Sequence, residues 1–156
     1  MKEWIMIGLI FVLVLSLGCV SDNNPKDVSP DHNIKIISRD CDLARDATLT
    51  IYDNGTVIYN GYDRGKEFYK TKRLSSEELE EYHSLALWVY DHIDNCHKEK
   101  LPPIQDIWGY TMIEVDGETK TISSLSVRFT CDNETSDKIN QLRSKINALK
   151  EELGAS

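Results

Sequence analysis

The segment His92-Ile93-Asp94-Asn95-Cys96-His97 holds the residue types that most readily bind a metal ion. On a helix, His92 and Cys96 would lie four residues apart on one face, and His97 follows directly, so an imidazole and a thiolate could both reach a zinc ion. The chain has no C-x-x-C or H-E-x-x-H pair to complete such a site. A histidine at the end of a helix also interacts favourably with the helix dipole. We therefore predict no cofactor, and keep a Cys/His metal module as an alternative.

Three cysteines, Cys41, Cys96 and Cys131, lie in the polar part of the chain. A helix is expected to end near Cys96 and to lead into a hairpin, and Cys131 follows just after that hairpin. Because a hairpin enters and leaves at the same end, Cys96 and Cys131 should lie close together. A Cys96–Cys131 disulfide is the expected pairing, with Cys41 as an alternative partner for either. An odd count leaves one thiol over, and a fully reduced chain is the other possibility.

Signatures of catalysis are absent from the sequence. There is no G-x-S-x-G elbow, no glycine-rich phosphate loop and no recognisable triad pattern. The chain carries 26 acidic and 18 basic side chains, a net charge of −8, and shows no basic stripe. Such a balance disfavours contact with a phosphate backbone. The sequence therefore predicts a protein that is not an enzyme and does not bind nucleic acid.

The N-terminal segment has the features of a secretory signal. The chain starts with the short charged segment Met1-Lys2-Glu3, and an apolar run from Trp4 to Leu17 follows. At about 1.5 Å per residue this run is shorter than the ~30 Å hydrocarbon core of a bilayer. We predict a signal peptide over residues 1–18, with an uncleaved membrane anchor as the alternative.

Cys19 follows this apolar run directly, and Gly18 precedes it. This context resembles the lipobox of prokaryotic lipoproteins, in which the cysteine is linked to a lipid. The usual order places leucine three residues before the cysteine and a small residue two before; here Ser16 and Leu17 are in the opposite order. Residues 19–33 are rich in Ser, Asn, Asp and Pro, as in a flexible tether. The resemblance implies lipid attachment at Cys19 and anchoring at the outer face of the cell membrane.

Periodic patterns organise the remaining chain into strands and helices. A short strand is expected at 34–37, a charged turn at 39–46, and a hairpin whose Asn54-Gly55 pair favours a type I′ turn. A further strand is expected at 67–72. A second hairpin joins strands at 108–115 and 119–122 through Asp116-Gly117, and 126–129 is expected to extend the sheet.

Two helices are expected besides these strands. Ser75 and Glu78 form a capping box that begins the first helix, which should fade near residues 94–95. The second, over 137–153, has apolar residues spaced by three and four, and Gly154 follows it. This order predicts an α+β domain over residues 34–156, in which an antiparallel sheet of hairpins packs against two helices on one face.

Two N-x-[ST] sequons, at Asn54 and Asn133, permit glycosylation in an exported protein. In each case a local role, in a turn or at a helix start, also explains the asparagine. Neither sequon is therefore taken as a modification site.

The stretch "TLTIYDNGTVIYNG", which follows a cysteine turn and precedes a capped helix, resembles small prokaryotic lipoproteins of unknown function. The order of elements is also similar to that of emfourin-like inhibitors of metalloproteases, with Asp106, Tyr110 and the "IEVDGETKTI" hairpin in the second half. The signal-like segment, the tether and the missing catalytic signatures together predict a membrane-tethered domain that binds a ligand or another protein outside the membrane. The resemblance to the inhibitors implies protease inhibition as an alternative.

Overall fold

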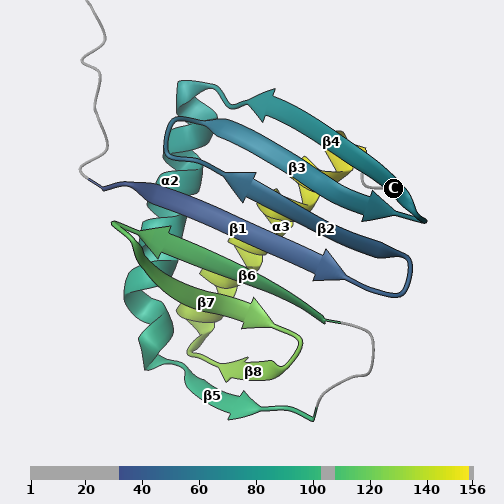
Figure 1. Cartoon of the computed structure of the whole chain (residues 1–156). Coiled ribbons are helices and arrows are strands. Elements are labelled where there is room, and N and C mark those ends of the chain that lie inside the picture. The colour runs from purple at the N-terminus through teal and green to yellow at the C-terminus, as the bar shows by residue number, and fades with distance from the viewer. Residues whose placement is uncertain (1–31, 103–107, 155–156) are drawn as a thin grey trace, which may run out of the picture.

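The computed structural model describes residues 32–102 and 108–154. Eight strands form one antiparallel sheet in the order β4-β3-β2-β1-β6-β7-β8-β5 (Figure 1). The strands are β1 (Ile34–Cys41), β2 (Arg45–Ile51), β3 (Thr56–Asp63), β4 (Lys66–Arg73), β5 (His97–Lys100), β6 (Trp108–Val115), β7 (Glu118–Ser124) and β8 (Val127–Thr130).

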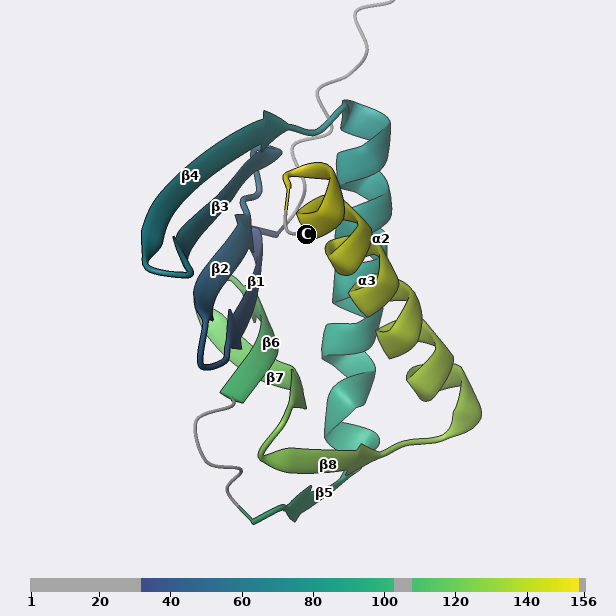
Figure 2. The same ribbon diagram turned by 90° about the vertical axis from the view of Figure 1, so that its right-hand side faces the viewer.

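Two helices cover one face of this sheet and leave the other face open (Figure 2). They are α2 (Ser76–His92), which a short 3₁₀ turn η1 (Ile93–Asn95) extends, and α3 (Asn133–Glu152). The predicted two-layer α+β fold is therefore confirmed. Within residues 32–102 and 108–154, neither helix is long and apolar enough to cross a bilayer.

The centre of the sheet is the pairing of β1 with β6, which joins residues far apart in the sequence. Ile36 lies opposite Ile113, and both side chains are fully buried. The helices supply the other half of the core, with Ala86 and Val89 from α2 and Leu142 from α3. Alternate residues of the central strands β1, β2 and β6 are buried, as expected for a sheet with one covered face.

The hairpin turns follow the sequence with one correction. Asp116 and Gly117 both have positive φ angles (52° and 89°), which fits the type I′ turn expected there. Gly55 has φ 79°, but Asn54 does not share a positive φ. Tyr52 and Thr56 instead close a three-residue loop, so the predicted type I′ turn at Asn54-Gly55 is wrong. The Asn54 side chain accepts a hydrogen bond from the Thr56 amide, 2.9 Å, and thus stabilises this longer loop.

The start of α2 agrees with the capping box. The Glu78 carboxylate accepts from the Ser75 amide at 2.8 Å, and the Glu78 amide donates to the Ser75 hydroxyl at 3.2 Å. The preceding residue, Leu74, is buried, and its amide donates to the Gly55 carbonyl. The first hairpin and the first helix are therefore joined at this point.

Three boundaries differ from the expectation. The segment 39–46 is not one turn, because β1 continues to Cys41 and β2 begins at Arg45; the polar residues there pair across the exposed face. The edge strand β5 was not expected, since its side chains, His-Lys-Glu-Lys, are all exposed and carry no apolar pattern. Helix α3 begins at Asn133 rather than 137, because the Asp132 carboxylate caps it through the Thr135 amide at 2.8 Å.

The buried histidine His83 gives the fold a pH dependence. It lies on α2, 8 % exposed, and its Nε2 has no hydrogen-bond partner among the described residues. Burial lowers the pKa of His83 below its ordinary 6.5, with Asp53 opposing this shift. Below pH 6.5 the unfolded chain therefore binds a proton at this residue more readily than the folded chain does. Stability contributed by neutral His83 is full above pH 6.5 and is lost as the pH falls towards the lowered pKa.

We expect the wild-type protein to lose more unfolding free energy than the His83→Gln variant when the pH falls from about 7 to about 5. Guanidinium unfolding curves at both pH values measure this difference. Because both proteins contain the other histidines, the contribution of those residues to the change in unfolding free energy cancels in the comparison. An equal loss in both would show that His83 does not carry the effect.

Candidate functional site

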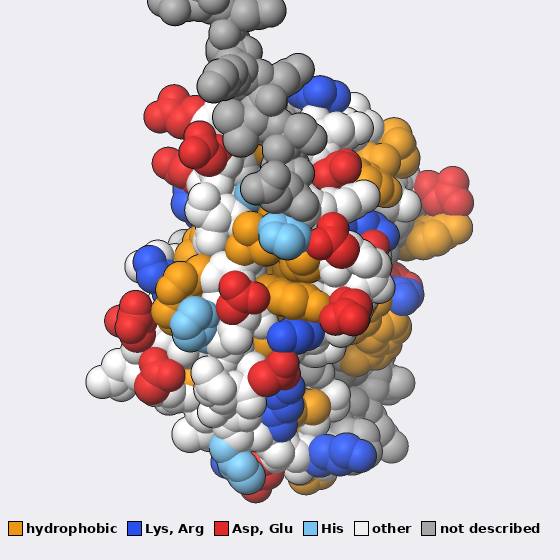
Figure 3. Space-filling model, turned by 90° about the vertical axis from the view of Figure 1, so that its left-hand side faces the viewer, with side chains coloured by type: hydrophobic (Ala, Val, Ile, Leu, Met, Phe, Trp, Pro, Cys, Tyr) orange, Lys and Arg blue, Asp and Glu red, His pale blue; other side chains and the backbone are white. Residues whose placement is uncertain are grey.

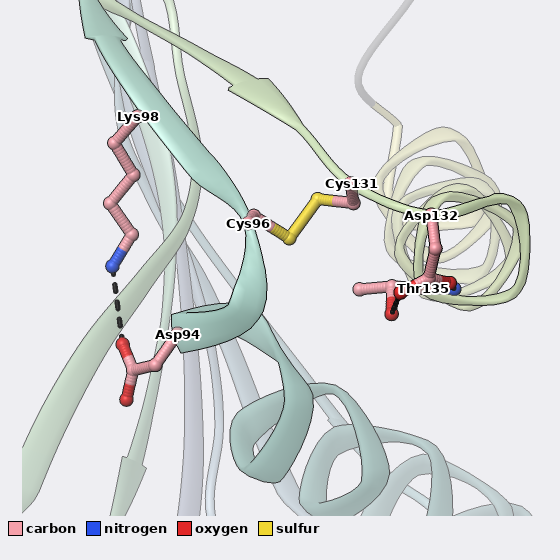
Figure 4. Close-up of a disulfide and its surroundings, with 6 residues drawn as sticks. All are labelled: Asp94, Cys96, Lys98, Cys131, Asp132 and Thr135. Atoms are coloured by element: carbon pink, nitrogen blue, oxygen red, sulfur yellow. Dashed lines mark hydrogen bonds and ion pairs between the residues drawn. A yellow bond between two sulfur atoms is a disulfide. The ribbon is translucent and has the colours of Figure 1, made fainter.

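The structure brings two of the predicted site residues into one bond. Cys96 and Cys131 form a disulfide between the end of η1 and the start of α3 (Figure 4). This is the pairing expected from the order of elements, and it leaves Cys41 as a free thiol at the end of β1. Cys19 and Asp106 lie outside the described residues, as do the signal segment 1–18 and almost all of the tether 19–33.

The histidines near this disulfide have other partners. The His92 ring stacks on Trp88 with centroids 4.0 Å apart, and its Nδ1 lies 2.8 Å from the Trp88 carbonyl oxygen. The Cys96 sulfur is held in the disulfide and is not a thiolate, while His97 is exposed on β5. No group of three His, Cys, Asp or Glu side chains in the described ranges could hold a metal ion. Figure 3 likewise shows the histidine side chains of that face separated by other residues.

A cleft of about 420 Å³ lies between the sheet and α3, at the end where β1 finishes and β6 begins. Its lining comes from β1, the β1–β2 turn, β6, the end of β7 and one stripe of α3. The α3 residues are spaced by three and four, which places them on one helical face. The lining consists of Ser38, Asp40, Cys41, Asp42, Trp108, Gly109, Tyr110, Thr111, Ser123, Ser124, Leu125, Arg143, Ile146, Asn147 and Lys150.

Lys150 places a buried charge in this cleft. Its side chain is only 7 % exposed, and its Nζ donates to the Ser38 hydroxyl at 2.9 Å and to the Asp40 carboxylate. Ser38 in turn shares a hydrogen bond of 3.2 Å with the Thr111 hydroxyl. Asp40 is 54 % exposed, so the network runs from the interior out to solvent. A buried ammonium is tolerated because these groups satisfy it.

A second group of polar residues lies on the open face of the sheet, beside the cleft. The Arg39 guanidinium binds the Asp46 carboxylate through two hydrogen bonds, 3.0 and 2.8 Å, and lies over the Trp108 ring at 4.2 Å. This bidentate pair lowers the pKa of Asp46 and raises the pKa of Arg39. Burial, together with Asp46, raises the pKa of the Cys41 thiol. A raised pKa leaves less thiolate, so Cys41 is not activated as a nucleophile.

The protonation and hydrogen bonds of the cleft residues bear on the chemistry that they could support. A general base needs a lone pair, and the Lys150 ammonium that donates to Ser38 and Asp40 offers none. Ser38 is therefore not placed as an activated nucleophile. What the cleft does offer is a row of hydroxyl groups, an amide and two cationic side chains beside an apolar wall, and such groups can orient a bound molecule.

Sequence reasoning missed these residues because they are brought together by the fold. Lys150 and Ser38 are 112 positions apart, and neither lies in a motif. One signal was present: Lys150 is four residues after the buried Ile146, on the same stripe of α3 as the apolar residues. A lysine on the buried face of a helix needs a partner in the interior.

No protein-family model matches this chain, and no curated protein does so either. The resemblances to small lipoproteins and to emfourin-like inhibitors therefore stay predictions.

Proposed function

We propose that this protein is an exported domain, tethered to the outer face of the cell membrane through a lipid on Cys19, that binds a small molecule in the cleft beneath α3. The apolar segment 4–17 and the polar stretch that follows it support the export and the tether. A disulfide that closes a loop across the domain supports an oxidising compartment, since such bonds are rare in the cytosol.

The buried lysine is the observation that carries the binding role. Burying an ammonium is costly, and apolar residues in place of a buried ion pair often leave stability unchanged or raise it. Lys150 instead holds Ser38 and Asp40 in fixed positions at the wall of an open cleft. Fixed polar groups in a concave site are what small-molecule recognition requires. The proposed role is accordingly binding and not catalysis.

Metabolic labelling with a radioactive lipid precursor tests the tether. We expect label in the wild-type protein and its loss in the Cys19→Ser variant, because only the cysteine thiol can form the thioether. Cys41→Ser is the matched control, since it removes the free thiol of the folded domain, and it should retain the label. Absence of label from all three proteins would contradict lipid attachment.

A further inference from the structure

The cationic side of the cleft comes from α3. Arg143 lines it one turn before Asn147 and two turns before Lys150. Lys150 is engaged by Asp40 and Ser38, whereas no residue in the described part of the chain forms a hydrogen bond or ion pair with the Arg143 guanidinium. Arg143 is also exposed, so its donors are available to a molecule that enters the cleft.

The acidic residues of the lining are already engaged. The Asp40 carboxylate accepts from Lys150. The Asp42 carboxylate accepts from the amides of Ala44 and Arg45, each at 2.8 Å, and so closes the β1–β2 turn. Of the four charged side chains in the lining, Arg143 is therefore the one that forms no hydrogen bond or ion pair within the described residues, whereas Asp42 keeps its charge but uses its carboxylate in the turn. A single unpaired guanidinium in an acidic protein favours an anion and repels a competing cation.

The charge count of the cleft indicates the kind of anion. Two acidic and two basic side chains line it, so its formal charge is zero and each negative charge on a ligand adds to it. A singly charged anion is therefore repelled less by Asp40 and Asp42 than a doubly charged phosphate. The planar fork of arginine fits a carboxylate through two parallel hydrogen bonds. The uncharged part of the lining, which includes Ser123, Asn147 and the apolar Ile146, suits a neutral body of mixed polarity.

We infer that the cleft binds a small organic monocarboxylate, with the carboxylate on Arg143 and its neutral body against Asn147 and the hydroxyl groups of the sheet. This inference rests on the proposed binding function and names the class of its ligand. A volume of about 420 Å³ limits the ligand to a size near that of one acylated amino acid or one sugar acid.

The test uses the full-length protein in detergent micelles and follows backbone amide shifts by NMR. The probes are N-acetyl-L-alanine with its neutral amide, and D-glucuronate with neutral glucose. We expect saturable shifts at Ser38, Thr111 and Asn147 with at least one carboxylate, and binding at least tenfold weaker with its neutral counterpart. Tighter binding of N-acetyl-L-alanine would indicate a ligand derived from peptides, and tighter binding of D-glucuronate would indicate a ligand derived from sugars.

Substitutions on α3 locate the carboxylate. Arg143→Ala should weaken binding of the carboxylate at least tenfold, because it removes a charge-assisted bidentate contact. The Arg143→Lys variant should bind the carboxylate with intermediate affinity, since lysine keeps the positive charge but lacks the planar guanidinium that makes two parallel hydrogen bonds. Lys138→Ala is the matched control: it removes a cation of the same helix that does not line the cleft, and it should bind as the wild type does.

Three results would overturn the inference. Unchanged affinity in Arg143→Ala, with its fold confirmed by the same spectrum, would show that Arg143 does not hold the ligand. Equal binding of a carboxylate and its neutral counterpart would overturn the carboxylate but leave a binding cleft, and so leave the proposed function in place. No saturable shift with either carboxylate would overturn the ligand class, and it would leave the lipid tether untouched.

Discussion

Removal of the Cys96–Cys131 disulfide is expected to lower the free energy of unfolding by about 4 kcal/mol. The bond joins residues 35 positions apart, and a cross-link of that span strongly restricts the unfolded chain. In the folded state it holds the start of α3 against the end of η1 (Figure 4). A loss of this size is a large part of the stability of a domain with one modest core.

Urea unfolding of the double variant Cys96→Ala/Cys131→Ala measures this effect. Hydrogen exchange should show the earliest opening at the pair β5–β8, since only four residue pairs hold that edge once the disulfide is gone. Cys41→Ser is the control, because Cys41 forms no disulfide. An unchanged unfolding midpoint in the double variant, relative to the wild type, would contradict the stabilising role.

Gly61→Ala is expected to destabilise the protein by about 3 kcal/mol, by forcing β2 and β3 apart. A Cβ at Gly61 would lie 2.1 Å from the Asp46 carbonyl oxygen and 2.7 Å from the Ala47 Cα. Both are backbone atoms of the neighbouring strand, so no side-chain rotation relieves the clash. The pairing of Ala47 with Gly61 would have to shift. This shift would disturb the neighbouring buried pair, Leu49 of β2 and Tyr59 of β3.

Gly65→Ala provides the matched control for this substitution. Gly65 sits in the turn between β3 and β4, with φ +77° and no atom within 4 Å of the added methyl group. The Gly65→Ala variant should therefore lose only about 1 kcal/mol of unfolding free energy, which is the cost of a left-handed conformation for alanine. Thermal unfolding followed by circular dichroism compares the two. Equal losses of stability in the two variants would show that the effect of Gly61→Ala comes from the backbone conformation at this position and not from the close approach to β2.

Local patterns were reliable where neighbouring residues act on one another. The capping box of Ser75 and Glu78, the Asp116-Gly117 turn and the apolar stripe of α3 all depend on residues a few positions apart. Those patterns, read in order, were enough for the two-layer α+β fold. The Cys96–Cys131 pairing also followed from order alone, because the hairpin between the two cysteines closes on itself.

Errors arose where a contact distant in sequence determines the local structure. The strand β1 continues through Arg39 to Cys41 because β2 and β6 pair with it on both sides, although the residues themselves are polar. The four-residue β5 exists because β8 offers it a partner. The turn at Asn54-Gly55 is one residue longer than expected, and its Gly55 packs near Leu74 and Leu79 at the start of α2.

Patterns within the chain were enough to predict the fold class, both helices and every strand except β5, because helix caps, turns and apolar periodicity are set by near neighbours. The sequence also carries the predictions of export and of lipid attachment at Cys19, which rest on residues outside the described structure. The cleft, in contrast, depends on contacts between residues far apart in the sequence. Ser38, Asp40 and Lys150 meet there because β1 pairs with β6 in the centre of the sheet and α3 crosses it, and no local pattern encodes the meeting of residues 110 or more positions apart.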